Sequence, residues 1–374
     1  MHLHKLILTQ FKNYAYQELE CSPGINCFIG KNGMGKTNLL DAIYYLCLSK
    51  SHFNLPDKLL VQHQNDFFRL DGRFFREEKA EKIVFKVWNG KKRELERNDI
   101  SCPRIADHVG LLPVVMIAPD DTQIATEGSE VRRRFLDNCL AQMDGEYLKQ
   151  LLVYNKIISQ RNALLKQFAE QGNFNTSLLD IYNQQLQQPA RLIFEKRQAF
   201  VAAFLPILHQ NYQLISQSAE TVDCLYVSDL EQADFQALLQ QNQEKDRILQ
   251  RTTKGIHKDD LEFQINGFPL KKFASQGQLK SFILALKLAQ HQIMALEKNR
   301  PPILLLDDIF DKLDESRVEN LLRLLTKPPF GQIFITDTGR EKLIQILEQL
   351  PVSFSKFIVE KGQIAHQEKF TQPT

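Results

Sequence analysis

The chain has 374 residues, 43% hydrophobic and 25% charged, which is ordinary for a folded protein and excludes disordered, fibrous and disulfide-rich classes. Its 47 basic and 45 acidic residues leave a net charge of +2, so any affinity for nucleic acid must come from local patches. The six cysteines contain no CxxC pair, which argues against a zinc site and favours reduced thiols. No signal peptide and no long apolar stretch is present, so we expect a cytoplasmic protein with no membrane partner.

The predicted elements begin with strands. Residues 3–98 have a sequence pattern that is mostly typical of strands. A short apolar run over 24–29 ends in a glycine-rich turn. Asn-Gly pairs predict antiparallel hairpins over 82–96 and 261–273, because both central residues of a type I′ turn need positive φ.

Residues 131–250 are rich in glutamine and contain only four glycines and prolines, which predicts helices. An amphipathic helix follows from Ser275, then a strand over 303–306, a helix from about 315 to 325 and a strand over 332–335. Two halves of one α/β domain are therefore expected to flank a helical insertion.

A phosphate-binding loop is predicted at residues 30–37, because the segment GKNGMGKT satisfies GxxxxGK[ST] between a predicted strand and a predicted helix. Backbone N–H groups of such a loop point at phosphate oxygens, and the start of the helix adds a favourable field. Lys36 would neutralise the β and γ phosphates, and the Thr37 hydroxyl would ligate Mg²⁺.

Two adjacent acids follow the apolar strand 303–306, at the end where open α/β sheets bind ligands. Asp307 is the candidate for the magnesium-side carboxylate, and Asp308 would hold or deprotonate the attacking water. The alternative is that one of the two acids only caps a turn together with Asp311 and Asp314.

A third motif, Ser-Gln-Gly-Gln at 275–278, opens the amphipathic helix. A serine at a helix start is common as a simple cap, but its hydroxyl and the exposed N–H groups also suit an anion. Its place between the phosphate loop and the acid pair favours a second phosphate-binding element.

With these motifs in this order, the chain resembles ABC-type ATPase heads of the SMC kind and, more narrowly, the RecF family of bacterial DNA replication and repair proteins. Further similar segments are residues 8–14, 120–121, 132–137, 255–260 and 311–314. The resemblance implies an α/β ABC-type ATPase head with mixed β-sheets, interrupted by an α-helical arm. The head would comprise 1–128 and 251–374, and the arm 129–250, which is too short for an SMC-type coiled coil.

The resemblance also implies how the family's site residues fall on this chain. Asp308, Lys36 and Ser275 would be catalytic, and Thr37 and Asp307 would hold the metal. The nucleotide-binding set would be Lys12, Asn13, Gly30, Asn32, Gly33, Gly35, Lys36, Thr37, Asn38, Ser275, Gln276, Gly277 and Gln278.

The family's mode of action would follow from those residues. ATP and Mg²⁺ would join two subunits head to tail, each signature serine capping the γ-phosphate held by the other subunit. The homodimer would bind double-stranded or gapped DNA, hydrolyse ATP slowly with stimulation by DNA, and act with the RecR and RecO mediators and RecA.

The chain departs from related patterns at three places. Ile256 and Lys258 replace a proline and an arginine of the family, which weakens any claim about bidentate contacts there. Thr336-Asp337-Thr338 stands where transporter-type relatives have a histidine. Asp120 and Gln123 are both candidates for the glutamine of the usual Q-loop.

Basic residues in three segments are candidates for contacts with DNA: Arg69, Arg73, Arg76, Lys91, Lys92, Arg93, Arg132, Arg133 and Arg134. Such runs are more often a solvated face, and the last three could instead pair with Asp120, Asp121 or Glu130. His257 could approach phosphate or DNA, or form a structural bond with Asp259 or Asp260.

Two other functions stay open at this stage. One is an energising ATPase with a non-DNA partner, against which the helical insertion and the double aspartate count. The other is a DNA-binding module that keeps ATP as a structural ligand with vestigial turnover.

Overall fold

The computed structural model describes the chain except for residues 77–78, 89–91, 217–219, 311–314, 340 and 372–374. The chain divides into two compact units, one formed by Met1–Asp121 with Leu286–Thr374 and the other by Thr122–Ala285. Within the described ranges, no helix is both long enough and apolar enough to cross a membrane.

The first unit contains most of the strands. Its strands are β1 (His2–Phe11), β2 (Tyr14–Glu20), β3 (Ile25–Ile29), β4 (Phe67–Arg76), β5 (Lys79–Trp88), β6 (Lys92–Arg97), β7 (Ile100–Ser101), β8 (Val114–Ile117), β12 (Ile303–Leu306), β13 (Ile333–Asp337), β14 (Phe354–Glu360) and β15 (Gln363–Phe370). Its helices are α1 (Lys36–Leu48), α10 (Glu315–Leu325) and α11 (Glu341–Gln349). Helix α9 (Gln276–Lys298) begins in the second unit and ends in the first.

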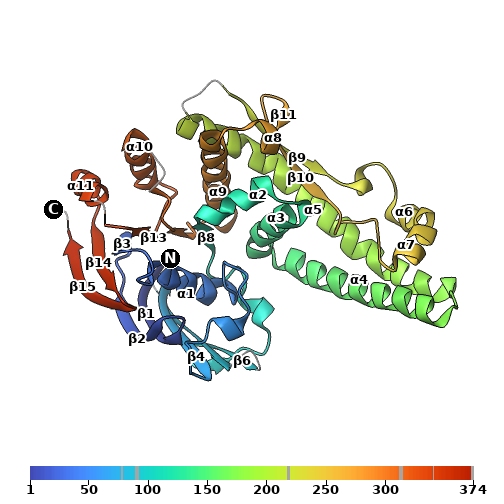
Figure 1. The fold of residues 1–374 in the computed structure, drawn as a ribbon, viewed down its shortest axis with the longest axis horizontal. Helices are drawn as coiled ribbons and strands as arrows, with labels where there is room; N and C mark the ends of the chain where they lie inside the picture. The colour runs from blue at the N-terminus through green and yellow to red at the C-terminus, as the bar shows by residue number, and fades with distance from the viewer. Residues whose placement is uncertain (77–78, 89–91, 217–219, 311–314, 340, 372–374) are drawn as a thin grey trace. The chain divides into compact units, whose positions relative to one another are not determined.

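Two sheets form the first unit. One has the order β15-β14-β3-β13-β12-β8 and is parallel except for β15, while the other is antiparallel with the order β2-β1-β4-β5-β6-β7. Helix α1 contacts strands of both sheets, and α10 and α11 lie on the other side of the parallel sheet (Figure 1). The central strands β3, β12 and β13 are buried along their whole length, which explains their mostly apolar sequences.

The second unit is mostly helical. Its helices are α2 (Gln123–Thr126), α3 (Ser129–Met143), α4 (Gly145–Gln171), α5 (Thr176–Ser216), α6 (Phe235–Gln241), α7 (Gln243–Leu249) and α8 (Leu270–Phe273). A three-stranded antiparallel sheet of order β11-β10-β9 completes it, formed by β9 (Val222–Val227), β10 (Asp260–Ile265) and β11 (Phe268–Pro269).

Helices α4 and α5 lie side by side and form the arm (Figure 1). Helix α4 has 27 residues and α5 has 41, so at 1.5 Å per residue they are about 40 and 60 Å long. Asp144 caps α4 by accepting hydrogen bonds from the N–H groups of Glu146 and Tyr147. The arm is therefore a short helical hairpin.

The predicted fold class is confirmed, and several elements have the predicted bounds. The strand 303–306 and the helix 315–325 are β12 and α10. Strands β5 and β6 pair as a hairpin, although the turn at 89–90 lies outside the described residues. Asn266 and Gly267 have φ of 49° and 78°, as the type I′ turn requires.

Two expectations about the elements were wrong, and one predicted strand is present with shifted bounds. Strand β9 lies inside the segment predicted to be helical, because its residues VDCLYV pair along the whole of β10. The hairpin predicted over 261–273 ends at Pro269, after which the chain forms α8. The strand predicted over 332–335 covers Ile333–Asp337.

The division into a head of 1–128 with 251–374 and an arm of 129–250 stays a prediction. The compact second unit has wider limits, because α3 contacts β10 and α2 contacts α8.

Candidate nucleotide-binding site

The predicted phosphate loop joins the end of β3 to the start of α1. The Lys36 side chain is buried, and its ammonium group donates to the carbonyl oxygens of Gly30 at 2.9 Å and Lys31 at 3.3 Å. It also reaches Asn32 Oδ1 at 3.5 Å. These contacts hold the positive charge at the loop, where the predicted role of Lys36 requires it.

Side chains from the β1–β2 turn support the loop from one side. Asn13 Nδ2 donates to the Met34 carbonyl at 3.2 Å, and Tyr14 Oη donates to the Gly35 carbonyl at 3.1 Å. Asn38 Nδ2 donates to Asn13 Oδ1 at 2.7 Å. A Cβ atom added at Gly35, where φ is 111°, would lie 2.5 Å from Asn13 Nδ2, so glycine is required there. Asn13 and Asn38 thus shape the loop, and direct contact with nucleotide stays a prediction.

Lys12, also predicted to bind nucleotide, forms an ion pair inside the first unit. Its Nζ lies 2.7 Å from Oδ2 of Asp41, a fully buried residue of α1. The same carboxylate accepts hydrogen bonds from the Ser51 hydroxyl and the His52 N–H, both at 2.8 Å. In this arrangement Lys12 neutralises a buried carboxylate.

The Asp307 carboxylate meets the phosphate loop across a sequence separation of 270 residues. Thr37 Oγ1 donates to Asp307 Oδ1 at 2.8 Å, and Thr336 Oγ1 donates to the same oxygen at 2.9 Å. Hydroxyl and carboxylate oxygens are hard donors of the kind Mg²⁺ prefers, so Thr37 and Asp307 fit the predicted metal site. Burial raises the pKa of Asp307 above its ordinary value, and the neighbouring Asp308 adds to the rise.

Asp308 follows at the carboxyl end of β12 and is only partly buried. Its backbone N–H donates to Thr336 Oγ1 at 2.9 Å, and its φ is 44°, an uncommon value for a non-glycine residue. The alternative that the acid pair caps a turn with Asp311 and Asp314 falls on residues outside those described, as does the predicted D-loop over 311–314.

Thr336 is the residue that sequence reasoning missed, because its position was noted only for lacking a histidine. It lies in β13, which the sheet order places between β3 and β12. Its hydroxyl therefore reaches both acids, donating to Asp307 and accepting from the Asp308 N–H. A polar residue at the carboxyl end of an apolar strand was the available signal, but the strand order needed to interpret it is a tertiary property.

The predicted signature motif belongs to the second unit. Ser275 precedes α9 as predicted and forms a capping box, since its N–H donates to Gln278 Oε1 at 2.6 Å and its Oγ accepts from the Gln278 N–H at 3.2 Å. Ser275, Gln276 and Gly277 are exposed. Gln278 Nε2 also donates to Glu220 Oε1 at 2.5 Å.

The arginines at the start of α3 are largely engaged within the second unit. Arg132 forms a bidentate pair with Asp260, at 2.6 and 2.8 Å, an acid that was not among its proposed partners. Arg133 donates to the Asp259 carbonyl at 2.6 Å. Arg134 is exposed and lies 3.8 Å from Glu130, one of the predicted partners.

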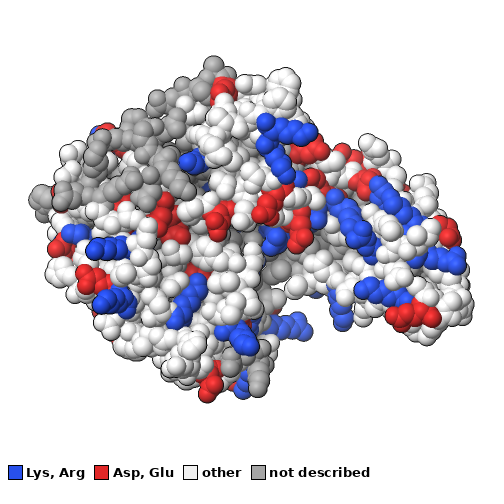
Figure 2. All heavy atoms as spheres, in the orientation of Figure 1, with Lys and Arg blue, Asp and Glu red and all other residues white. Residues whose placement is uncertain are grey.

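Most basic candidates on the antiparallel sheet also contact acids. The pairs are Arg69 with Asp71 at 3.2 Å, Arg76 with Glu81 at 3.0 Å, Lys92 with Glu94 at 2.5 Å, and Arg93 with Asp57. Arg73 is exposed, and Lys91 lies outside the described residues. On the described part of the face in Figure 2, acidic and basic side chains are interspersed, in keeping with the small net charge.

His257 makes a structural contact, but with other partners than the sequence suggested. Its Nδ1 lies 2.8 Å from Tyr154 Oη and its Nε2 lies 3.1 Å from the Thr252 carbonyl. Neither Asp259 nor Asp260 is its partner among the contacts of the described residues.

Comparison with known proteins agrees with the motifs. Residues 2–357 match the family described as RecF/RecN/SMC N terminal domain. The chain is 45% identical to the DNA replication and repair protein RecF of Flavobacterium johnsoniae, covering 96% of this chain and 99% of the relative. It is 42% identical to the RecF protein of Parabacteroides distasonis, covering 99% of this chain and 100% of the relative.

Solved structures show the same relationship. A structure of the recombination mediator protein RecF-ATP of the RecFOR pathway superposes with a TM-score of 0.87 at 27% identity, covering 99% of this chain and 98% of the other. The Smc head domain of Pyrococcus furiosus shares the fold, with a TM-score of 0.58 at 15% identity, over 99% of this chain and 96% of the other. The chain belongs to the RecF family, within the wider group of RecF, RecN and SMC proteins.

Proposed function

We propose that this protein is an ATP-binding and ATP-hydrolysing DNA repair protein in which ATP joins two copies head to tail and the dimer binds DNA. The observation that carries the proposal is the 2.8 Å contact between Thr37 and Asp307, which unites the two halves of a nucleotide and metal site. Its relatives are named DNA replication and repair proteins, and a solved relative is described with ATP.

Each side chain of the site has a distinct task. The loop N–H groups and Lys36 bind the triphosphate, and Thr37 and Asp307 hold Mg²⁺, which when bound offsets the charge of the phosphate oxygens. Asp308 orients the attacking water and accepts its proton, a role that suits a partly buried carboxylate beside the metal site. Thr336 positions Asp308 through its backbone N–H.

A head-to-tail dimer is supported by the exposed surface around Ser275. The rings of Phe268 and Phe273 lie 4.9 Å apart and are 55% and 59% exposed. Large exposed aromatic side chains in a cluster are typical of interaction surfaces. In the dimer, Ser275 caps the γ-phosphate bound by the loop of the other copy, and the two rings pack against that copy.

The dimer binds duplex or gapped DNA through exposed basic side chains such as Arg73, Lys92 and Arg134, so binding is independent of sequence and falls steeply with salt. DNA stimulates a slow ATPase. The RecR and RecO mediators and RecA are the partners, and the cytoplasm is the place of action.

Sedimentation velocity tests the dimer. The wild-type protein is expected to dimerise with ATP and Mg²⁺, while Lys36→Ala and Ser275→Arg stay monomeric. Gln236→Arg, which adds the same charge at an exposed position of α6, is the control and should dimerise normally. Dimers of Ser275→Arg, or a monomeric wild type with bound ATP, would contradict the head-to-tail arrangement.

Asp308→Asn tests whether hydrolysis is a working step. The variant should bind ATP, form a longer-lived dimer and lose turnover by roughly 100-fold or more, because the base that accepts the proton is gone. Unchanged turnover and dimer lifetime would instead indicate that ATP is only a structural ligand.

A further inference from the structure

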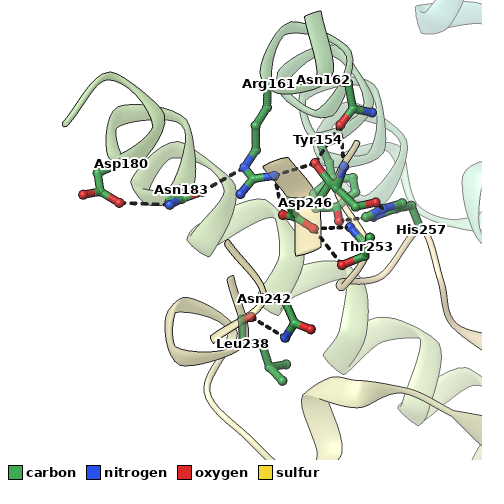
Figure 3. Close-up of polar contacts among 11 residues, drawn as sticks. Tyr154, Arg161, Asn162, Asp180, Asn183, Leu238, Asn242, Asp246, Thr253 and His257 are labelled. Atoms are coloured by element: carbon green, nitrogen blue, oxygen red, sulfur yellow. Dashed lines mark hydrogen bonds and ion pairs between the residues drawn. The ribbon is translucent and has the colours of Figure 1, made fainter. Parts of the chain in front are cut away.

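The loop over residues 251–258, between α7 and β10, is held by a buried polar network in the second unit (Figure 3). Arg161 of α4 is fully buried, and its Nη1 donates to Asp246 Oδ2 and to Thr252 Oγ1, both at 2.8 Å. Its Nε donates to Asn183 Oδ1 of α5 at 2.9 Å. One side chain thus ties two arm helices, α7 and the loop together.

Within the loop, Thr252 and Thr253 each form two further hydrogen bonds. Thr252 donates from its N–H and its hydroxyl to Asn162 Oδ1, at 2.7 and 2.8 Å. Thr253 does the same to Asp246 Oδ1, at 2.8 and 2.6 Å. These four hydrogen bonds fix the backbone at Thr252 and Thr253 to side chains of α4 and α7.

His257 closes the loop on itself. A carbonyl can only accept, so His257 Nε2 carries the proton donated to the Thr252 carbonyl at 3.1 Å, and Nδ1 accepts from the Tyr154 hydroxyl. Burial lowers the pKa of His257 to about 4, so the ring is neutral at physiological pH and this tautomer persists.

Closure between residues 252 and 257 brings the flanking residues Arg251 and Lys258 together, and both are exposed. Arg133 donates to the carbonyl of Asp259, the residue after Lys258, and so lies beside them. Burial, followed by repulsion from Arg251 and Arg133, lowers the pKa of Lys258. The loop therefore holds like charges close to one another.

The acidic residues near this loop form ion pairs with other basic residues. The pairs are Asp246 with Arg161, Asp259 with Arg197, Asp260 with Arg132, and Asp229 with Lys254. Within the part of the chain that the structure describes, neither Arg251 nor Lys258 forms an ion pair. Exposed cations that lie close together without ion-pair partners form a favourable site for an anion from outside the unit.

We propose that Arg251 and Lys258 form a contact site for the phosphate groups of a DNA strand, presented by the network around Arg161 and His257. The inference rests on the proposed DNA binding and adds a site on the second unit to it. A DNA strand supplies phosphate anions in succession, and contacts to phosphate do not depend on base sequence.

The test is the salt dependence of duplex binding by the full chain with ATP and Mg²⁺, followed by fluorescence anisotropy. Replacing both cations, as Arg251→Gln with Lys258→Gln, should lower the slope of log K against log salt by about 1.8, since each phosphate contact contributes about 0.9. Over a fourfold range of salt, that change corresponds to about a tenfold difference in affinity.

Two control variants separate local contact from net charge. Lys149→Gln with Arg191→Gln removes the same charge from the arm helices, at exposed side chains that pair with Glu146 and Glu195, and should leave the slope unchanged. Arg251→Lys with Lys258→Arg keeps both charges and should retain the wild-type slope. All variants should bind ATP and unfold thermally like the wild type, because the changed side chains are exposed.

The outcomes distinguish the two proposals. A wild type that binds DNA, together with an unchanged slope in the double glutamine variant, overturns the phosphate site and leaves the proposed function standing. Equal losses in the Lys149 and Arg191 control overturn it too, since net charge would explain both. A wild type that binds ATP but not DNA overturns the proposed function, and the phosphate site with it.

Discussion

Two adjacent aspartates at the end of β12 have different surroundings. Asp307 is 4% exposed and accepts hydrogen bonds from two threonine hydroxyls. Asp308 is only partly buried, and its backbone N–H donates a hydrogen bond to the Thr336 hydroxyl. Burial raises the pKa of Asp307 because the charged form loses hydration. These surroundings suit Asp307 to binding a metal cation and Asp308 to accepting a proton from water.

The raised pKa of Asp307 predicts a gain in stability from Asp307→Asn. The folded protein binds this proton more tightly than the unfolded chain, so the wild type loses stability as pH rises from the ordinary aspartate range through the raised value. Asparagine keeps an acceptor oxygen for Thr37 and Thr336 without the charge. Near neutral pH we expect the variant to gain about 1 kcal/mol of unfolding free energy.

Urea unfolding of the nucleotide-free protein at two pH values checks this. The gain should shrink near pH 4, where the wild-type carboxyl is protonated as well. ATP hydrolysis should be lost in the same variant, because the metal ligand is gone. If the variant were less stable than the wild type near neutral pH, the cost of burying the Asp307 charge would not be the main contribution to stability at this site.

At the scale of elements, the loop between α7 and β10 depends on one backbone position. Gly255 has φ of 122°, and an added Cβ would lie 2.7 Å from Tyr154 Oη and 2.8 Å from Phe235 Cε2. Any side chain there must displace Tyr154, the partner of His257. The loop therefore packs directly against the arm helix α4 at this position.

Gly255→Ala is expected to destabilise the second unit by roughly 2–4 kcal/mol, from backbone strain and overpacking. Hydrogen exchange of α4 and of the loop, with thermal unfolding, is the measurement. Gly145→Ala at the start of α4 is the control, because an added Cβ there meets no atom within 4 Å. Equal stability and equal hydrogen exchange of the two variants would mean that the loop accommodates the added methyl group without losing stability.

Across the described parts of the molecule, burial lowers the pKa of five histidines, His2, His52, His108, His257 and His291. The pKa values of His52, His257 and His291 are each lowered to about 4, mainly by loss of hydration. They belong to both compact units, so acidification acts on each of them.

Acidification is therefore expected to destabilise the protein well above the range in which carboxylates protonate. Between about pH 6.5 and 4 the unfolded chain binds protons that the folded histidines do not, so stability falls as pH falls, by up to about 1.4 kcal/mol per pH unit for each histidine. Melting temperatures measured from neutral pH downward should show the decline. His291→Gln, which can still donate to the Pro302 carbonyl, should make the decline less steep, and an unchanged profile would contradict this account.

Sequence alone determined the features that depend on short-range chemistry. The phosphate loop, strand β12, helix α10 and the Asn266-Gly267 turn are each specified within a few residues, by glycine spacing, apolar periodicity and turn stereochemistry. The helix start at Ser275 was predictable for the same reason, since a capping box is local. The pattern of elements predicted an α/β domain with a helical insertion, and the resemblance to a known family implied the ABC-type fold class.

Only the tertiary structure decided which distant groups meet. It brought Thr336 to the acid pair, placed β9 beside β10 inside an expected helical segment, and paired Arg132 with Asp260 instead of the acids near it in sequence. It likewise placed the exposed cations Arg251 and Lys258 near each other, on either side of the contact between His257 and Thr252. The first three of these contacts join residues that are 29 positions apart, as for Thr336 and Asp307, to 128 apart, as for Arg132 and Asp260. They depend on strand order and on burial, and neither leaves a local pattern in the chain.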